Sequence, residues 1–165
     1  YKNGLGSPRK LADYGVRLTE RINSPMIMIS KVVTEEFIDY NQHVSEAAYY
    51  SISIRSLQEL HEQLGLNSLF WEYNIAPIVF NSRIDFVREM FKDEEMKIKV
   101  EFLAKSKDFR KWDRTFEILN GSEKTAALVE SEGAFFDLKK RKVCSPPIQI
   151  VRAFNDVGLL ESNRE

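Results

Sequence analysis

The residues best suited to chemistry lie together in one polar stretch, DYNQH at positions 39–43. A carboxylate such as Asp39 can attack an electrophile or accept a proton, and His43 can exchange protons near neutral pH. Glu46 follows at the point where a long helical pattern begins. Aspartate and asparagine are also common in tight turns, and the helix dipole stabilises a glutamate in a first turn whatever its function. These residues alone therefore leave open a helix-capping loop and an active site.

The polar stretch must be positioned by the helix that follows it. We predict a helix over Glu46–Leu64, with Ser45 as its N-cap and Gly65 as its stop. Its apolar residues cover more than one side, which is typical of a helix that is wrapped by a curved sheet. The last turns carry Glu59, His61, Glu62 and Gln63, and we expect that end to reach water. Helical spacing is clearest at Tyr50, Ile54, Leu57 and Leu64.

The segments around this helix have the pattern of strands. Alternating or β-branched runs predict strands over residues 26–33, 75–87, 96–103, 112–119 and 125–138, and a short helix over 146–154. One helix followed by a run of antiparallel strands indicates an α+β domain. We place this domain at residues 26–155, between a flexible or peripheral arm at 1–25 and a tail at 156–165. A dimer that extends the sheet would protect its open edge.

Composition limits the functional classes. The chain has 165 residues, which fits one domain. Its net charge of −1 gives no field that would favour nucleic acid or an anionic membrane. The single cysteine, Cys144, fits a reducing compartment, and we expect a cytoplasmic protein. The first residues carry no apolar core of a signal peptide, and no spacing typical of a zinc site or of a phosphate loop occurs.

Three blocks of residues resemble the hotdog-fold acyl-CoA thioesterases, the group around 4-hydroxybenzoyl-CoA thioesterase. Residues 39–45, DYNQHVS, are similar to the family signature D-Y-N-G-H-M-N before its central helix. Residues 83–89 and 133–138 resemble two of its strands. The resemblance covers about residues 27–154 and implies a long central helix wrapped by an antiparallel sheet of about five or six strands. Gln42 and Ser45 depart from the Gly and Asn of the signature, and Lys92-Asp93 replaces a Gly turn.

The resemblance also implies roles for individual residues. The carboxylate matching Asp39 acts in this family as nucleophile or as general base for water. His43 is expected to orient the loop or to bind substrate, and Asn41 to position water or hold the loop. Glu46 is a second candidate acid, because related thioesterases sometimes place the acid on the helix. Backbone N–H groups around the helix start would polarise the carbonyl, so substrate contacts are expected at Ala47, Ala48 and Tyr49, the last as a core residue rather than a catalytic one.

Coenzyme A would require cations for its phosphates. One candidate cluster in a turn between strands contains Lys105, Lys107, Arg110 and Lys111, and a second is the run at 139–142. Charge runs in turns are usually only solvated, so both clusters have an alternative without function. Arg110 is the first to test, because a guanidinium grips phosphate with two parallel bonds.

Three functions remain open at this level. The leading hypothesis is an acyl-CoA thioester hydrolase that is a homodimer or a dimer of dimers and needs no metal or cofactor beyond the CoA of its substrate. The alternatives are a non-catalytic acyl-CoA-binding module and, with His43 as the catalytic base, an acyl-thioester hydratase or dehydratase. The aromatic residues Phe70, Trp71, Tyr73 and Phe80 suit short, branched or aryl acyl groups alike.

Overall fold

The computed structural model describes residues 16–21, 24–156 and 161–162. Its helices are the 3₁₀ turn η2 (Glu35–Phe37), α1 (Glu46–Gln63), α2 (Leu66–Tyr73) and α3 (Ile148–Asp156). Its strands are β1 (Val16–Arg21), β2 (Ser24–Val32), β3 (Ile75–Phe86), β4 (Glu95–Ala104), β5 (Lys111–Leu119), β6 (Thr125–Asp137), β7 (Lys142–Val143) and β8 (Glu161–Ser162). No helix in these ranges is long and apolar enough to cross a membrane.

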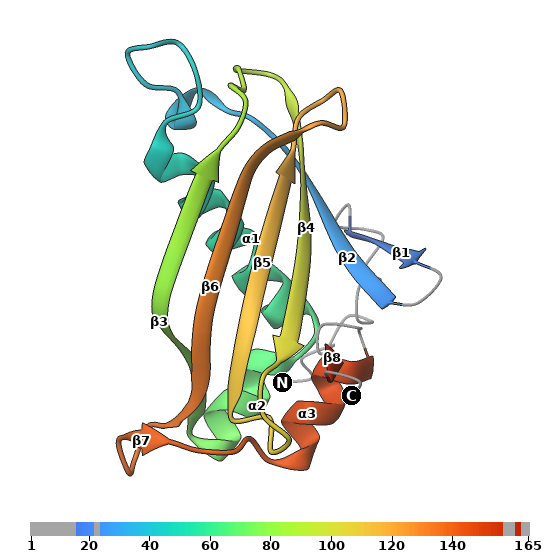
Figure 1. Ribbon diagram of the computed structural model, residues 1–165, viewed down its shortest axis with the longest axis vertical. Coiled ribbons are helices and arrows are strands. Elements are labelled where there is room, and N and C mark those ends of the chain that lie inside the picture. The colour runs from blue at the N-terminus through green and yellow to red at the C-terminus, as the bar shows by residue number, and fades with distance from the viewer. Residues whose placement is uncertain (1–15, 22–23, 157–160, 163–165) are drawn as a thin grey trace, which may run out of the picture.

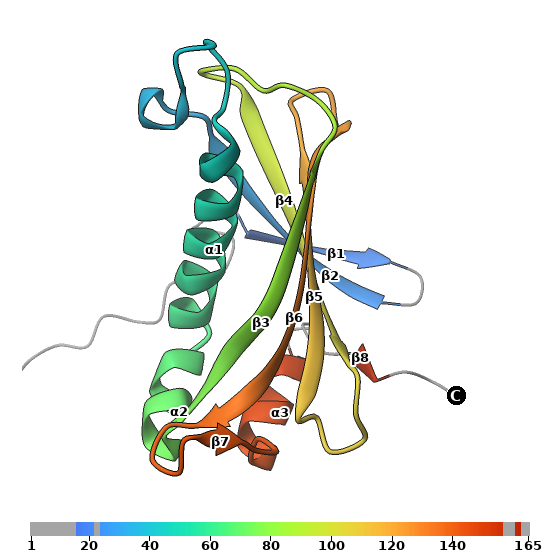
Figure 2. The same cartoon turned by 60° about the vertical axis from the view of Figure 1, so that its left-hand side comes forward.

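One sheet forms the framework of the molecule. Its strands follow the order β1-β2-β4-β5-β6-β3, and neighbours on this path are antiparallel. The short β7 pairs with β6, and β8 pairs in parallel with the end of β4. Helix α1 runs along one face of this sheet (Figures 1 and 2). The predicted hotdog arrangement is confirmed, since a long helix lies against a curved antiparallel sheet of about the expected size.

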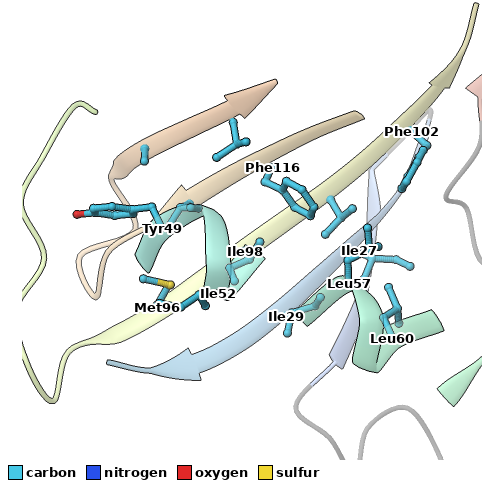
Figure 3. Packing of buried hydrophobic residues seen from close by; sticks show 14 of the residues in the cluster. Ile27, Ile29, Tyr49, Ile52, Leu57, Leu60, Met96, Ile98, Phe102 and Phe116 are labelled. Atoms are coloured by element: carbon cyan, nitrogen blue, oxygen red, sulfur yellow. The ribbon is translucent and has the colours of Figure 1, made fainter. Parts of the chain in front are cut away.

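The core lies between α1 and the inner face of the sheet, as Figure 3 shows. Side chains alternate across a strand, so every second residue of β4 and β5 points towards the helix. The helix contributes Ala48, Tyr49, Ile52, Leu57 and Leu60 to this core. The periodic patterns in the sequence are therefore explained by burial on one face.

The structure adds elements at both ends of the predicted domain. Val16–Arg21, which the sequence places in the arm, forms β1 and pairs with β2. Residues 1–15 lie outside the described residues. Within the predicted tail, Glu161–Ser162 forms β8. The sheet thus takes in segments whose sequences carry too few apolar residues to be recognised as strands.

The segment after the long helix forms a second helix for which no element was predicted. Helix α1 ends at Gln63, and Gly65 follows with a φ of 71°, a left-handed conformation that glycine adopts without steric cost. The chain then resumes as α2. Gly65 therefore ends one helix and serves as the N-cap of the next.

Only part of the last turns of α1 reaches water. Glu59 and Glu62 are exposed, but His61 is only 6% exposed and packs edge-on against the rings of Phe70 and Phe154. Burial, aided by the positive charge of Arg114, lowers the pKa of His61 to about 4. The expectation of solvent at this residue is wrong, because α3 supplies Phe154 and covers this side of the helix.

Candidate active site

The polar stretch folds into a tight hairpin directly before α1. Ile38 pairs with Val44, the Asp39 N–H donates to the carbonyl of His43 over 3.0 Å, and the Gln42 N–H donates to the carbonyl of Asp39 over 3.0 Å. Gln42 has a φ of 66°, which is the conformation that glycine would adopt freely at the corresponding signature position. The hairpin therefore keeps the glycine-like backbone although the side chain has changed.

The carboxylate of Asp39 is held in place inside this hairpin. Its Oδ1 accepts the backbone N–H of Asn41 at 2.8 Å, an arrangement typical of an Asx turn. The same oxygen lies 3.7 Å from Nε2 of His43, which is too long for a hydrogen bond but close enough for an ion pair with a protonated ring. Asp39 is thus fixed in orientation while its side chain remains 25% exposed.

His43 connects the hairpin to the segment that follows β3. Its Nδ1 lies 2.9 Å from Oε1 of Glu89, so the imidazole stands between two carboxylates. The backbone supports this contact, because the Val44 N–H donates to the carbonyl of Met90 at 2.9 Å. Glu89 was not among the predicted site residues. Its only signal in the sequence is its place in the block 83–89.

The start of α1 provides hydrogen-bond donors beside the hairpin. Ser45 is the N-cap, as predicted, and its Oγ accepts the N–H of Ala48 at 3.3 Å. This bond, together with one to the Ser45 carbonyl at 3.0 Å, occupies the Ala48 donor. The N–H groups of Glu46 and Ala47 have no intrahelical acceptor, because they lie in the first turn. The predicted donor set of residues 46–48 is therefore reduced to its first two members.

A cavity of about 320 Å³ opens between the helix start and the end of β3. Its lining combines predicted residues with new ones: His43, Val44, Glu46, Tyr49, Phe86, Val87, Arg88 and Glu89. Tyr49 forms the inner wall, with its ring 5.6 Å from that of Phe86 and its hydroxyl donating to the carbonyl of Arg88 at 3.2 Å. Burial, with the carboxylates of Glu94 and Glu89 nearby, raises the pKa of Tyr49 to about 12, so it stays a neutral phenol.

The predicted cation cluster around Arg110 is distant from the hairpin in the structure. The turn between β4 and β5 is at the end of the sheet opposite the hairpin (Figures 1 and 2). Two of its cations already have carboxylate partners, Arg110 with Asp108 at 3.0 Å and Lys105 with Asp113 at 2.8 Å. Lys107 lies in the same turn, and Lys111 begins β5, where its backbone N–H donates to Ser106 Oγ at 3.1 Å. A single chain therefore does not bring this cluster and Asp39 together.

The comparisons with known proteins identify the family. A model of the thioesterase-like superfamily matches residues 32–154, which is more than half of the chain and includes every lining residue of the cavity. The chain belongs to the thioesterase-like superfamily. The matched range includes both the hairpin and the start of α1. A search of curated proteins finds no match.

Solved structures confirm the fold of this superfamily member. A 1,4-dihydroxy-2-naphthoyl-CoA thioesterase from Synechocystis is 14% identical, with a TM-score of 0.69, covering 80% of this chain and 97% of that one. A Staphylococcus aureus protein solved in complex with CoA is 13% identical, with a TM-score of 0.72 and coverages of 89% and 93%. YbaW, a probable thioesterase from Escherichia coli, is 17% identical, with a TM-score of 0.68 and coverages of 79% and 98%.

The site of this thioesterase-like protein can supply acid–base and nucleophilic groups. His43 and Glu46 line the cavity at the helix start. The predicted Asp39 and Asn41 are not among its lining residues, and the Asp39 carboxylate is linked to it through His43. In the described part of the chain, His, Cys, Asp and Glu side chains form no group of three or more that could hold a metal ion. The aromatic residues of α2 and Phe80, expected as acyl walls, are not among the lining residues of this cavity.

Proposed function

We propose that this protein hydrolyses an acyl-CoA thioester to a free acid and CoA. The observation that carries the proposal is a cavity at the start of α1 that His43 lines, with the Asp39 carboxylate 3.7 Å from the imidazole. Membership of the thioesterase-like superfamily supports the reaction class. The relative solved with CoA supports CoA as the carrier of the acyl group.

Asp39 is the proposed catalytic carboxylate. Both of its contacts use Oδ1, which leaves Oδ2 for the reaction. As a nucleophile, Oδ2 forms a bond to the thioester carbon, the carbon–sulfur bond breaks, and water then hydrolyses the resulting anhydride. As a general base, Asp39 instead takes a proton from water while the water oxygen attacks the same carbon. Both routes end with a carboxylic acid and a CoA thiol.

The helix start is the proposed oxyanion site. The free N–H groups of Glu46 and Ala47 and the positive end of the helix dipole favour negative charge on the carbonyl oxygen as the tetrahedral state forms. A donor of this kind is typically worth ~3 kcal/mol in the transition state. Placing the donors and Asp39 on consecutive segments fixes their relative orientation without a further element.

Glu89 is proposed as a positioning residue for His43. Its carboxylate, 2.9 Å from Nδ1, fixes the plane of the ring and directs Nε2 towards Asp39. His43 would in turn orient the carboxylate and the substrate. Glu46 lines the cavity at its mouth and is exposed, so it is kept as the alternative acid.

The active form is proposed to be a dimer. Strand β3 is an edge strand of twelve residues, and most of its central residues are exposed. A long exposed edge favours pairing with another strand, and a second copy would bring its own cation clusters closer to this cavity. We also propose a cytoplasmic location, because the single free cysteine, Cys144, fits a reducing compartment.

A thiol-release assay tests the function. Purified protein is mixed with CoA esters of short, long, branched and aryl acids, and free thiol is followed over time against a heat-denatured control. Catalytic release from at least one ester is the expected result. Tight binding without release would favour the non-catalytic module. Conversion of an enoyl-CoA with no thiol released would favour the hydratase.

Light scattering after size-exclusion chromatography tests the assembly separately. The expected result is a mass of two or four chains at micromolar concentration. A clean monomer that still releases thiol would leave the reaction in place and reject the shared pocket.

A further inference from the structure

A row of polar side chains crosses the inner face of the sheet at a single level. Arg114 of β5 is the register partner of Ser131 on β6, and Ser131 is the partner of Ser82 on β3. Hydrogen bonds connect the row: Arg114 Nη2 donates to Ser131 Oγ at 3.2 Å, and the two serine hydroxyls lie 2.9 Å apart. Tyr50 of α1 closes it, with its hydroxyl 3.3 Å from Ser82 Oγ.

Arg114 is a buried cation, and the side chains described around it are aromatic rings and hydroxyl groups. Only 5% of it is exposed, and in the described ranges no carboxylate forms an ion pair or a hydrogen bond with it. Its guanidinium lies over the rings of Phe116, Trp112 and Phe102 at 4.8, 5.5 and 5.9 Å. Burial lowers the pKa of Arg114 and the Tyr50 hydroxyl opposes this effect, but arginine keeps its proton in proteins.

The core around Arg114 contains further buried nitrogen atoms without a hydrogen-bond partner. Within the described residues, Nε of Arg114, Nε1 of Trp112 and Nε2 of His61 are all buried without a hydrogen-bond partner. Trp112 is 1% exposed and lies two positions before Arg114 on the same face of β5. Buried polar atoms are normally satisfied, and a buried charge without a counter-charge is costly. A bound anion would supply the missing counter-charge for Arg114 and accept hydrogen bonds from the unpaired N–H groups beside it.

The row and the cavity border the same face of β3, at different levels of the strand. Ser82, Ile84 and Phe86 lie on the helix-facing side of β3, and Phe86 lines the cavity. Ser82 and Phe86 are both exposed although they face the helix. Four residues of strand separate them, a distance of ~13 Å. Strand β3 therefore leads from the cavity towards the level of the polar row.

We propose that Arg114 recognises a carboxylate at the far end of the acyl group, so that the substrates are thioesters of dicarboxylic acids. This inference rests on the proposed hydrolase function and names its substrate class. The free Nε–H and an Nη–H form the fork that suits a carboxylate. The aromatic rings around the guanidinium exclude water, and the three-strand row fixes its position. The ~13 Å from Phe86 to Ser82 corresponds to an extended chain of roughly ten atoms, and a chain that reaches Arg114 across β6 must be at least that long.

Paired substrates test this inference on the wild-type protein. The kcat/KM for thiol release is measured for CoA monoesters of dicarboxylic acids and for uncharged acyl-CoAs of equal length. We expect a preference of about ten- to a hundredfold for the carboxylate-bearing ester at the matching length. Equal or greater activity on the uncharged partner at every length would overturn the inference and leave the proposed hydrolysis intact.

Two variants test whether Arg114 causes the preference for carboxylate-bearing esters. Arg114→Met is expected to abolish it, and Arg114→Lys, which keeps the charge but loses the fork, is expected to retain part of it. Arg83→Met is the matched control, because Arg83 is exposed on β3 and pairs with Asp85. An unchanged preference in folded Arg114→Met would reject Arg114 as its source. If neither Arg114 variant folds, the wild-type preference decides.

A binding measurement separates this inference from the reaction itself. Calorimetry with free linear dicarboxylates, and with uncharged linear diols of the same length, reports the site even if no ester is hydrolysed. Saturable binding of the dicarboxylate alone, lost in Arg114→Met and kept in Arg83→Met, is the expected result. Failure of hydrolysis with retained binding would reject the proposed function only. Absence of dicarboxylate binding to the wild-type protein would overturn the inference.

Discussion

Helix α1 has a histidine near each end, and the two lie in opposite surroundings. His43, just before the helix, is partly exposed and stands between the carboxylates of Asp39 and Glu89. His61, in the last turn, is buried between the rings of Phe70 and Phe154, and its pKa is lowered to about 4. The first environment surrounds the imidazole with acidic side chains. The second excludes charge and leaves the ring as part of the core.

The two ends of α1 also differ in how their local structure affects stability. At the start of α1, Gln42 takes a left-handed conformation and the first-turn N–H groups remain free, features that cost stability locally. At the other end, side chains from α1, α2 and α3 fill space around Phe154. Departures from local rules tend to gather at functional sites, and the hairpin that we propose as the site contains such a departure at Gln42. The following tests act on either end.

The largest expected effect on the free energy of unfolding comes from the packed end. Phe154 is fully buried and contacts Phe102 and Phe135 as well as His61. We expect Phe154→Ala to lower stability by about 3–5 kcal/mol in urea denaturation, because it removes a large buried ring and leaves a cavity. Tyr40→Ala, at a residue that is 90% exposed in the hairpin, is the control and should change little. A loss below about 1 kcal/mol for Phe154→Ala would mean that this end is not tightly packed.

The second effect is the pH dependence that His61 confers. Its pKa is about 4 in the folded protein and ~6.5 in the unfolded chain. Between these values the unfolded chain binds a proton that the folded protein does not, so stability is full above pH ~6.5 and falls as the pH drops towards 4. We expect a contribution of about 2–3 kcal/mol over this window. Denaturation of wild type and His61→Leu at several pH values isolates it, and parallel curves would reject the assignment.

The smallest effect concerns the hairpin. Replacing Gln42 by glycine removes the cost of a left-handed backbone, so Gln42→Gly should raise stability by about 1 kcal/mol. Gln58→Gly is the matched control, because Gln58 is exposed within α1 and should lose about 1 kcal/mol there. Opposite signs for the same substitution in thermal or urea denaturation are the expected outcome. A loss at Gln42 would mean that its side chain makes a compensating contact.

Local patterns in the sequence were enough to predict much of the fold. Alternation revealed β4 and β5, helical spacing revealed α1, and the short hydroxyl side chain of Ser45 marked the cap. Each of these depends on neighbours a few residues apart. The strand β1 was not predicted, because its pairing with β2 is what makes it a strand.

The site was predictable only in part for the same reason. The hairpin is local, so Asp39 and His43 could be recognised from one stretch of sequence. The contact between His43 and Glu89 joins residues 46 positions apart, and the burial of His61 depends on α3 near the end of the chain. Arg114 fits an alternating strand, but nothing around it in the sequence indicates that it lacks an acidic partner. Such features become visible only when the distant elements are in place.

The rate of thiol release by Asp39→Asn tests the central claim most directly, namely that the hairpin before α1 performs the chemistry. Asparagine can keep the bond from the Asn41 N–H but cannot attack the thioester or take a proton from water. Glu36→Gln, an exposed carboxylate in η2 that bonds Thr34, is the matched control. With an ester that wild type hydrolyses, we predict a fall in kcat of about a hundredfold or more for Asp39→Asn and none for the control. A folded Asp39→Asn protein with the wild-type kcat would contradict the account.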